Sequence, residues 1–292
     1  MRRRTPKQVS SLRRSFVAGQ FYENDAEALK LQIKTCFLSK LGPKKLPTVN
    51  FTNQPRNIVG LISPHAGYMY SGAVAASGFF ELAQDGLPET IVILSPNHTG
   101  RGSGVSLMRE GIWQTPLGNI HIDTTLSDTI LSKTNIIDID KIAHQFEHSI
   151  EVQLPFLQYL YGNKFKIIPL CILMQDYQTA IEIGNTLTEA LTAYNAIVIA
   201  SSDMTHYEPV KQAEKKDKLA LNTITANLDA YRFYETIKTQ NITACGYAPI
   251  TALITYAKNL NAKAELLNYH NSGDVSGDYS SVVGYASALF KK

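Results

Sequence analysis

Three short apolar runs, each ending in serine and followed closely by a histidine, constrain the fold of this chain most. The runs span residues 58–63, 90–95 and 196–202, and the histidines after them are His65, His98 and His206. An apolar run of this length, bounded by turn residues, is typical of a buried strand. Helix-like segments separate the runs, and strands alternating with helices predict an α/β fold with a parallel sheet.

The same repeat predicts a functional site. Parallel strands bring their carboxyl ends to one edge of the sheet, where ligands of open α/β folds bind. We therefore expect His65, His98 and His206 to converge on one patch. Imidazoles in such a patch bind metals or act as general bases. A single histidine on such a turn can merely cap a helix, but the repetition favours a site.

A second polar cluster lies at residues 144–151, which hold two histidines and two glutamates. The order is not His-Glu-x-x-His, so the zinc-protease motif is absent. The cluster can be a metal site or a proton relay, or a polar helix start that binds water. Of its members, we expect Glu147 and His148 to face the site.

The three cysteines (Cys36, Cys171 and Cys245) are too widely spaced for a disulfide framework or a zinc ribbon. This favours reduced thiols and a cytoplasmic location. Cys36 and Cys171 lie in apolar contexts typical of core residues. Cys245 precedes a predicted helix at 250–258, where the helix N-terminus is expected to lower the thiol pKa and suit ligand chemistry. The residues alone slightly favour the alternative, a small core residue.

Local signals predict further elements. Asp25 is expected to cap a helix that reaches Leu38. Short strands at 105–108 and 120–122 are expected to form a hairpin-like insertion that walls the site with Trp113. A helix starting near Ser149 is expected to run to Tyr161 and to bend at Pro155.

Charge and hydropathy limit the partners. The net charge is +3, and the excess is concentrated in residues 1–14, which we interpret as a solvated basic tail, with contact to RNA or anionic lipid as the alternative. The rest of the chain is near neutral, so no nucleic-acid face is expected. No apolar stretch approaches the length of a membrane span. The 292 residues are enough for one large α/β domain or two small ones.

Several motifs together resemble the Memo family, whose prokaryotic members are called AmmeMemoRadiSam system protein B. The motifs are Ala18-Gly-Gln-Phe-Tyr22, Ser63-Pro-His65-Ala-Gly-Tyr68, Ser95-Pro-Asn-His98, Glu147-His148-Ser-Ile-Glu151, Ser201-Ser-Asp203-Met-Thr-His206 and Cys245-Gly246. The family is similar in fold to class III extradiol dioxygenases. The resemblance implies a single α/β/α sandwich with a mostly parallel central sheet over residues 15–292, and the family's name suggests a functional link to a radical SAM protein.

The resemblance also implies roles for individual residues. In those dioxygenases two histidines and a glutamate bind Fe(II), and another histidine is the acid–base residue. Carried over, His65 and His98 are metal ligands, and Cys245 takes the glutamate's place. His206 becomes the acid–base residue, assisted by Asp203. A thiolate is softer than a carboxylate and suits Cu(I), zinc or iron–thiolate bonding. We expect one metal ion, with iron favoured and copper or zinc as alternatives.

Three functions follow as hypotheses. The first is redox or dioxygenase-like chemistry on an unknown small-molecule or peptide substrate, with Glu147 and His148 orienting water or substrate. The second is a non-catalytic protein whose vestigial site holds a metal or an aromatic peptide side chain. The third is metal-free hydrolysis by Ser202, Asp203 and His206, which we disfavour because neighbours along one turn rarely reach triad geometry.

Overall fold

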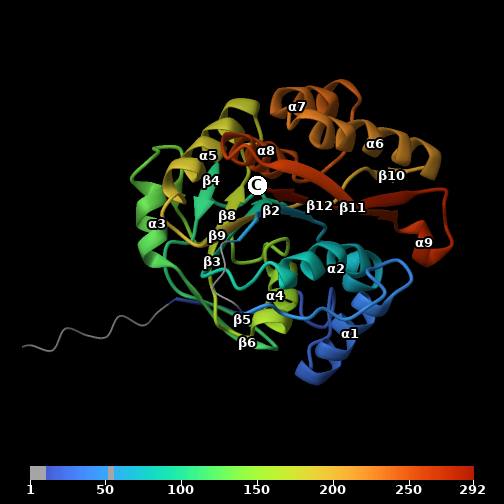
Figure 1. The fold of residues 1–292 in the computed structure, drawn as a ribbon, viewed down its shortest axis with the longest axis horizontal. Helices are drawn as coiled ribbons and strands as arrows, with labels where there is room; N and C mark the ends of the chain where they lie inside the picture. Colours follow the sequence, from blue (N-terminus) through green and yellow to red (C-terminus); the bar gives the residue numbers. More distant parts are fainter. Residues whose placement is uncertain (1–10, 52–55) are drawn as a thin grey trace, which may run out of the picture.

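The computed structural model describes residues 11–51 and 56–292. A central sheet lies between two layers of helices (Figure 1), which confirms the predicted α/β/α architecture. The strand order is β1-β5-β6-β8-β3-β9-β2-β12-β10, with β11 beside β12 and β4 beside both β8 and β7. The middle strands β8, β3, β9 and β2 are parallel, whereas β12 runs antiparallel to β2.

The strands have the following bounds: β1 Leu12–Arg13, β2 Ile58–Ser63, β3 Thr90–Pro96, β4 Val105–Leu107, β5 Ile112–Thr115, β6 Gly118–Ile122, β7 Asp138–Ile139, β8 Lys166–Ile172, β9 Ala196–Ser201, β10 His206–Glu208, β11 Lys263–Asn271 and β12 Val282–Lys291. The helices are α1 Ala26–Leu38, α2 Tyr68–Gln84, α3 Thr124–Leu131, α4 Leu154–Tyr161, α5 Tyr177–Ala190, α6 Val210–Asn227, α7 Ala230–Thr239, α8 Tyr247–Asn259 and α9 Gly273–Ser276, with a 3-10 turn at Glu151–Gln153.

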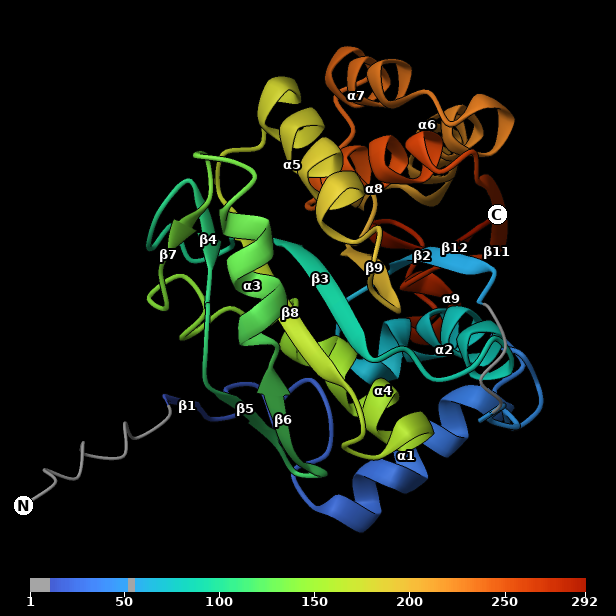
Figure 2. The same cartoon turned by 60° about the vertical axis from the view of Figure 1, so that its left-hand side comes forward.

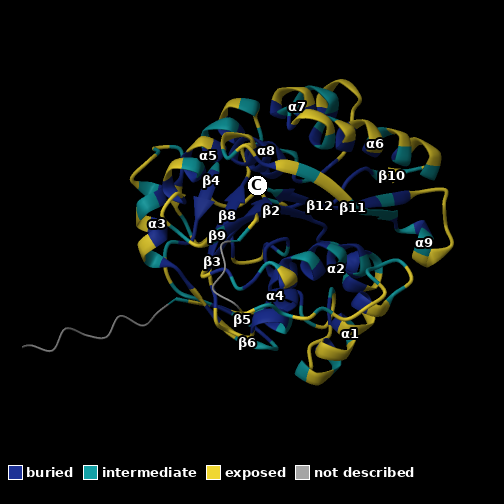
Figure 3. Ribbon diagram, in the orientation of Figure 1, coloured by how far each residue is buried: buried dark blue, intermediate teal, exposed yellow. Residues whose placement is uncertain are grey.

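Two apolar cores lie on the two faces of the sheet, because successive side chains of a strand point to opposite faces. In β3, Val92 and Leu94 belong to the core under α3, α5 and α6–α8. Ile91 and Ile93 belong to the core under α1, α2 and α4. Figure 3 shows the strands buried between helices whose outer faces are exposed. Both faces of the middle strands are therefore covered, as expected for parallel strands.

The local predictions have mixed outcomes. Asp25 caps α1 by accepting from the main-chain N–H groups of Glu27 and Ala28, as predicted. The hairpin joins β5 to β6, whereas the predicted first strand, β4, pairs instead with β8 and β7. Trp113 is fully buried within β5, so it cannot present a wall to a substrate.

Pro155 does not bend a helix, because α4 begins at Leu154. At this position proline has no intrahelical hydrogen bond to remove and its fixed φ suits the first turn. A 3-10 turn at Glu151–Gln153 comes before α4, so the predicted helix is two shorter elements. Among the described residues, no helix is both long and apolar enough to cross a bilayer.

The interpretation of Arg13 as part of a solvated tail is wrong, because its side chain is only 5% exposed and pairs with Glu151. Arg13 belongs to β1, which lies beside β5 and β6 at one end of the sheet (Figure 2). The other predicted tail residues, from 1 to 10, lie outside the described residues. Part of the segment that charge alone assigned to solvent is therefore built into the fold.

Candidate metal centre

His65 lies two residues beyond β2 and is buried. Its Nδ1 is 2.9 Å from Ser201 Oγ. That hydroxyl donates its only proton to the main-chain oxygen of Ser149 and accepts from Gln153 Nε2. His65 Nδ1 must therefore be the donor, which leaves a lone pair on Nε2. Burial lowers the pKa of His65 well below its ordinary value, so the ring is neutral at pH 7.

His98 follows strand β3, which β9 separates from β2, and is held by Glu147. Its Nδ1 lies 2.8 Å from Glu147 Oε1, and its main-chain N–H donates to Oε2 at 2.6 Å. Ser149 donates to the same carboxylate through its main-chain N–H and its hydroxyl. Burial alone would raise the pKa of Glu147, but the bond from His98 and the nearby imidazoles lower it to about 2. An ionised carboxylate that orients a histidine is typical of metal sites.

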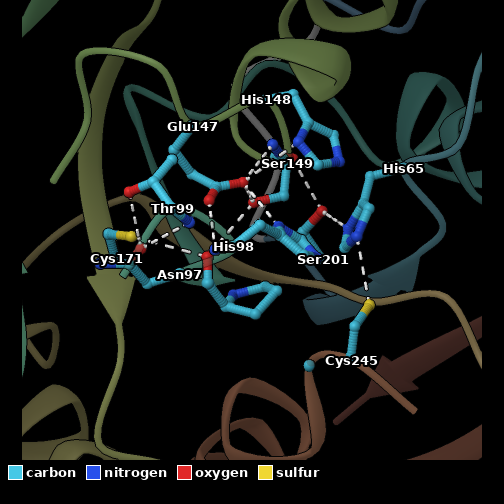
Figure 4. Close-up of polar contacts among 12 residues, drawn as sticks. His65, Asn97, His98, Thr99, Glu147, His148, Ser149, Cys171, Ser201 and Cys245 are labelled. Carbon is cyan, nitrogen blue, oxygen red and sulfur yellow. Dashed lines mark hydrogen bonds and ion pairs between the residues drawn. The ribbon is translucent and has the colours of Figure 1, made fainter. Parts of the chain in front are cut away.

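His148 completes a trio with His65 and His98 (Figure 4). Each histidine offers a ring nitrogen, and these nitrogens lie within 4.8 Å of one another. The His148 ring centroid is 4.5 Å from that of His98 and 5.3 Å from that of His65. Burial lowers the pKa of His148 to about 4, although Glu147 opposes this shift. His65 and His148 are thus neutral at pH 7 and can offer lone pairs to a metal ion.

Cys245 lies on the other side of His65, with its Sγ 3.2 Å from Nε2. Because Nε2 carries a lone pair, the thiol is the donor in this contact. The predicted lowering of the thiol pKa is wrong: burial, followed by the charge of Asp203, raises the pKa of Cys245. Cys245 precedes the first residue of α8, Tyr247, and desolvation outweighs the helix N-terminus.

Asp203 and His206 follow β9 and have different surroundings. Asp203 is buried, its Oδ1 accepts from the main-chain N–H of His65 at 2.8 Å, and burial raises its pKa. His206 Nδ1 donates to the main-chain oxygen of Thr243 at 2.9 Å. His206 is not part of the trio, whose third member is His148. Two of the three histidines expected to converge therefore belong to the trio, and the third, His206, lies near enough for its charge to contribute to the lowered pKa of His65.

The arrangement also bears on the hydrolase hypothesis. Ser202 Oγ donates to the main-chain oxygen of Asp203 at 2.7 Å and accepts from the main-chain N–H of Gly246 at 2.9 Å. Its proton is therefore committed to a carbonyl and not to a histidine. This arrangement does not form a nucleophile–base pair.

Sequence reasoning did not single out the residues that orient His65, namely Ser149, Gln153 and Ser201. Ser201 ends β9, and Ser63 and Ser95 occupy matching positions in β2 and β3. The repeated terminal serine was visible in the sequence, but its role as a hydrogen-bond partner of an imidazole was not. Gln153 comes from the 3-10 turn before α4, far away in sequence.

The three-histidine cluster fits a metal ion, because each imidazole offers a ring nitrogen within 4.8 Å of the other two. A family model described as Memo-like protein matches residues 13–289 of the chain. The chain belongs to the Memo family.

Relatives of this Memo protein match along nearly its whole length. A MEMO1 family protein of Methanopyrus kandleri is 48% identical over 279 residues, covering 94% of this chain and 98% of the relative. Another, of Methanothermobacter thermautotrophicus, is 49% identical over 278 residues and covers 94% and 99%. The Memo resemblance seen in the motifs is thereby confirmed.

A solved structure supports the fold of the Memo protein independently. An uncharacterized protein from Escherichia coli K12 superposes with a TM-score of 0.56 at 15% identity. The match covers 80% of this chain and 99% of that chain. At this level of identity the likeness concerns the architecture alone.

Proposed function

We propose that this Memo protein binds one metal ion through His65, His98 and Cys245, and uses it in redox chemistry on a small-molecule or peptide substrate. Iron is the favoured metal, with copper or zinc as alternatives. The observation that carries the proposal is the orientation of the two imidazoles. Ser201 holds Nδ1 of His65 and Glu147 holds Nδ1 of His98, so each Nε2 is left for a metal.

Cys245 is the third ligand in this proposal because of its distance from His65. Two ligand atoms bound at roughly 2.0–2.3 Å to one tetrahedral ion lie about 3.5 Å apart. The separation of 3.2 Å between Cys245 Sγ and His65 Nε2 is close to this value. His148 then lies beside the open coordination position, where it and Glu147 orient water or substrate.

His206 serves as the acid–base residue in the proposal. Its Nδ1–H is fixed by the main-chain oxygen of Thr243, so Nε2 can take up or release a proton. Asp203 assists by holding the main chain of His65 in place. A bound redox metal would supply an open position at which substrate is activated.

Metal content after anaerobic purification tests the proposal directly. We expect near-stoichiometric metal by mass spectrometry in the unaltered protein, and its loss in His65→Ala and Cys245→Ala. Cys36→Ala is the matched control, because Cys36 is also a free cysteine but belongs to the core between α1 and α2. Folded, unaltered protein that binds no iron, copper or zinc would contradict the proposal.

Proton release distinguishes the two possible ligand sets. Burial raises the pKa of Cys245, so the thiol is protonated at pH 7 and must lose its proton to bind as thiolate. Calorimetric zinc titration in buffers of different ionisation enthalpy should show one proton released per ion, and none in Cys245→Ser. Absence of release in the unaltered protein would assign the metal to His65, His98 and His148 instead.

A further inference from the structure

The N-terminal segment, residues 12–22, packs against the site loop, residues 144–151, which carries Glu147 and His148. Arg13 makes the first connection. Its Nη2 donates to the main-chain oxygen of Glu147 at 2.7 Å, and its Nε donates to that of His144 at 3.1 Å. Its guanidinium also lies 4.4 Å from the ring centroid of Trp113. The guanidinium therefore fixes two carbonyl groups of the site loop.

Glu151 makes the reciprocal connection from the end of the site loop. Its carboxylate is fully buried and pairs with Arg13. It accepts hydrogen bonds from the main-chain N–H groups of Phe16 and Val17 at 2.9–3.0 Å and from the Tyr22 hydroxyl at 2.5 Å. Each segment thus holds the main chain of the other, through a buried ion pair whose polar atoms are well satisfied.

Phe21 adds a direct contact with the trio. Its ring centroid lies 4.9 Å from that of His148. Its main-chain oxygen accepts from the N–H of Tyr68, three residues after His65, at 2.8 Å. The His148 Nδ1 lies 3.5 Å from Glu147 Oε1, which is too long for a strong hydrogen bond. The position of His148 therefore depends on packing against Phe21 and on the main chain that Arg13 holds.

We propose that Arg13 and Glu151 are positioning residues of the metal centre. They act through the main chain of Glu147 and set where its carboxylate and the His148 ring lie. This inference rests on the proposed metal-binding function. His65 is also held from β9, by Ser201 and Asp203, so loss of Arg13 should displace the His98–Glu147–His148 side more than it displaces His65.

The test compares Arg13→Met and Arg13→Lys with a matched control, Arg56→Met. Arg56 is also a buried arginine, 8% exposed in its side chain, and pairs with Asp85 at 3.3 Å. It precedes β2, at the edge of the sheet opposite the trio. Zinc affinity is measured by competition with a chelator, the Co²⁺ absorption spectrum reports ligand geometry, and thermal unfolding reports stability.

We expect Arg13→Met to weaken zinc binding roughly 10–100-fold, as for other residues that orient ligands. The Co²⁺ spectrum should change in the same variant. Arg13→Lys should recover part of the affinity, since lysine keeps the charge but lacks the guanidinium fork. Arg56→Met should lose stability while its affinity and spectrum stay unchanged. Folded Arg13→Met with the affinity and spectrum of the unaltered protein would overturn the inference.

Two further measurements test the positioning role if Arg13→Met does not fold or if the unaltered protein binds no metal. If Arg13→Met does not fold, Tyr22→Phe offers a milder change, because it removes a single hydrogen bond to Glu151. This variant should also bind zinc more weakly. Unchanged zinc affinity in Tyr22→Phe would contradict the positioning role of Glu151. If the unaltered protein binds no metal, the proposed function fails. Imidazole ¹⁵N NMR of the metal-free protein then still tests the positioning: His98 and His148 resonances should shift in Glu151→Gln and stay fixed in Arg56→Met.

Discussion

Gly246 determines how closely Cys245 can approach His65. A Cβ at this position would lie 2.5 Å from the main-chain oxygen of Ser201 and 2.7 Å from Ser202 Cβ. The first of these atoms ends β9 and cannot move without disturbing the sheet. The residue after Cys245 must therefore lack a side chain for the thiol to reach Nε2 of His65 at 3.2 Å.

We accordingly predict that Gly246→Ala moves Cys245 away from His65. The overlap should cost about 1–3 kcal/mol of unfolding free energy, as is usual for overpacking, and zinc affinity should fall with it. Gly67→Ala is the matched control beside the same site, since its Cβ would meet only Phe21 main-chain atoms at 3.5 Å or more. Urea unfolding and zinc competition measure both effects; equal behaviour of the two variants would refute the role given to Gly246.

At the scale of elements, helix α5 packs closely on α8 through Gly184. A Cβ there would lie 2.6 Å from both the main-chain oxygen of Ala252 and Thr255 Cβ. Intrinsic propensity favours alanine over glycine in a helix by about 1 kcal/mol. Packing opposes propensity at this position, and distances this short make the packing cost the larger of the two effects.

We predict that Gly184→Ala destabilises the protein despite its better helix propensity. The net cost should be about 1–2 kcal/mol, because the overpacking of α5 on α8 exceeds the gain. Gln178→Ala, at an exposed position of the same helix, should stay within about 0.5 kcal/mol of the unaltered protein. Urea unfolding checks both; a more stable Gly184→Ala would show that the two helices can separate at little cost.

Local patterns predicted the elements that carry the site, and tertiary contacts decided the rest. The runs that became β2, β3 and β9 are continuous and apolar, so the sequence located His65 and His98 at one sheet edge. His148 was expected near the site, but its place in the trio depends on Phe21, more than a hundred residues away in sequence. A contact between residues so far apart in sequence produces no periodic pattern of apolar residues, so the sequence does not reveal it.

The same reason explains the two clearest errors. Arg13 looked like a tail residue because its buried partner, Glu151, lies 138 positions along the chain. Cys245 looked activated because a helix follows it, whereas its pKa is controlled by burial and by Asp203, which comes from the end of β9. The local pattern of charges predicts neither the burial of a side chain nor its contacts with residues from other elements.

At the scale of the whole molecule, the junction between the N-terminal segment and the site loop contains a histidine that resists protonation. His144 is fully buried, and its Nε2–H donates to the main-chain oxygen of Ser106 at 3.1 Å. Its Nδ1 has no hydrogen-bond partner within the described part of the chain. Burial lowers the pKa of His144 to about 4, with a smaller contribution of the same sign from Arg13.

This depressed pKa makes the folded state sensitive to acid. In the unfolded chain a histidine titrates near 6.5, so between pH 6.5 and about 4 the unfolded state binds a proton that folded His144 does not. Stability must therefore fall as the pH falls through this window, by up to about 1.4 kcal/mol per pH unit and about 3 kcal/mol in all. Above pH 6.5 and below pH 4 His144 adds no pH dependence.

His144→Gln isolates this contribution, because an amide can still donate to Ser106 but does not titrate. His65 and His148 also have depressed pKa values and remain in both proteins, so the variant loses the uptake of one proton only. Urea unfolding at several pH values between 4.5 and 7.5 should give a shallower slope for His144→Gln. Parallel slopes would mean that His144 takes up its proton in the folded state, and hence that the junction between the N-terminal segment and the site loop opens before the molecule unfolds.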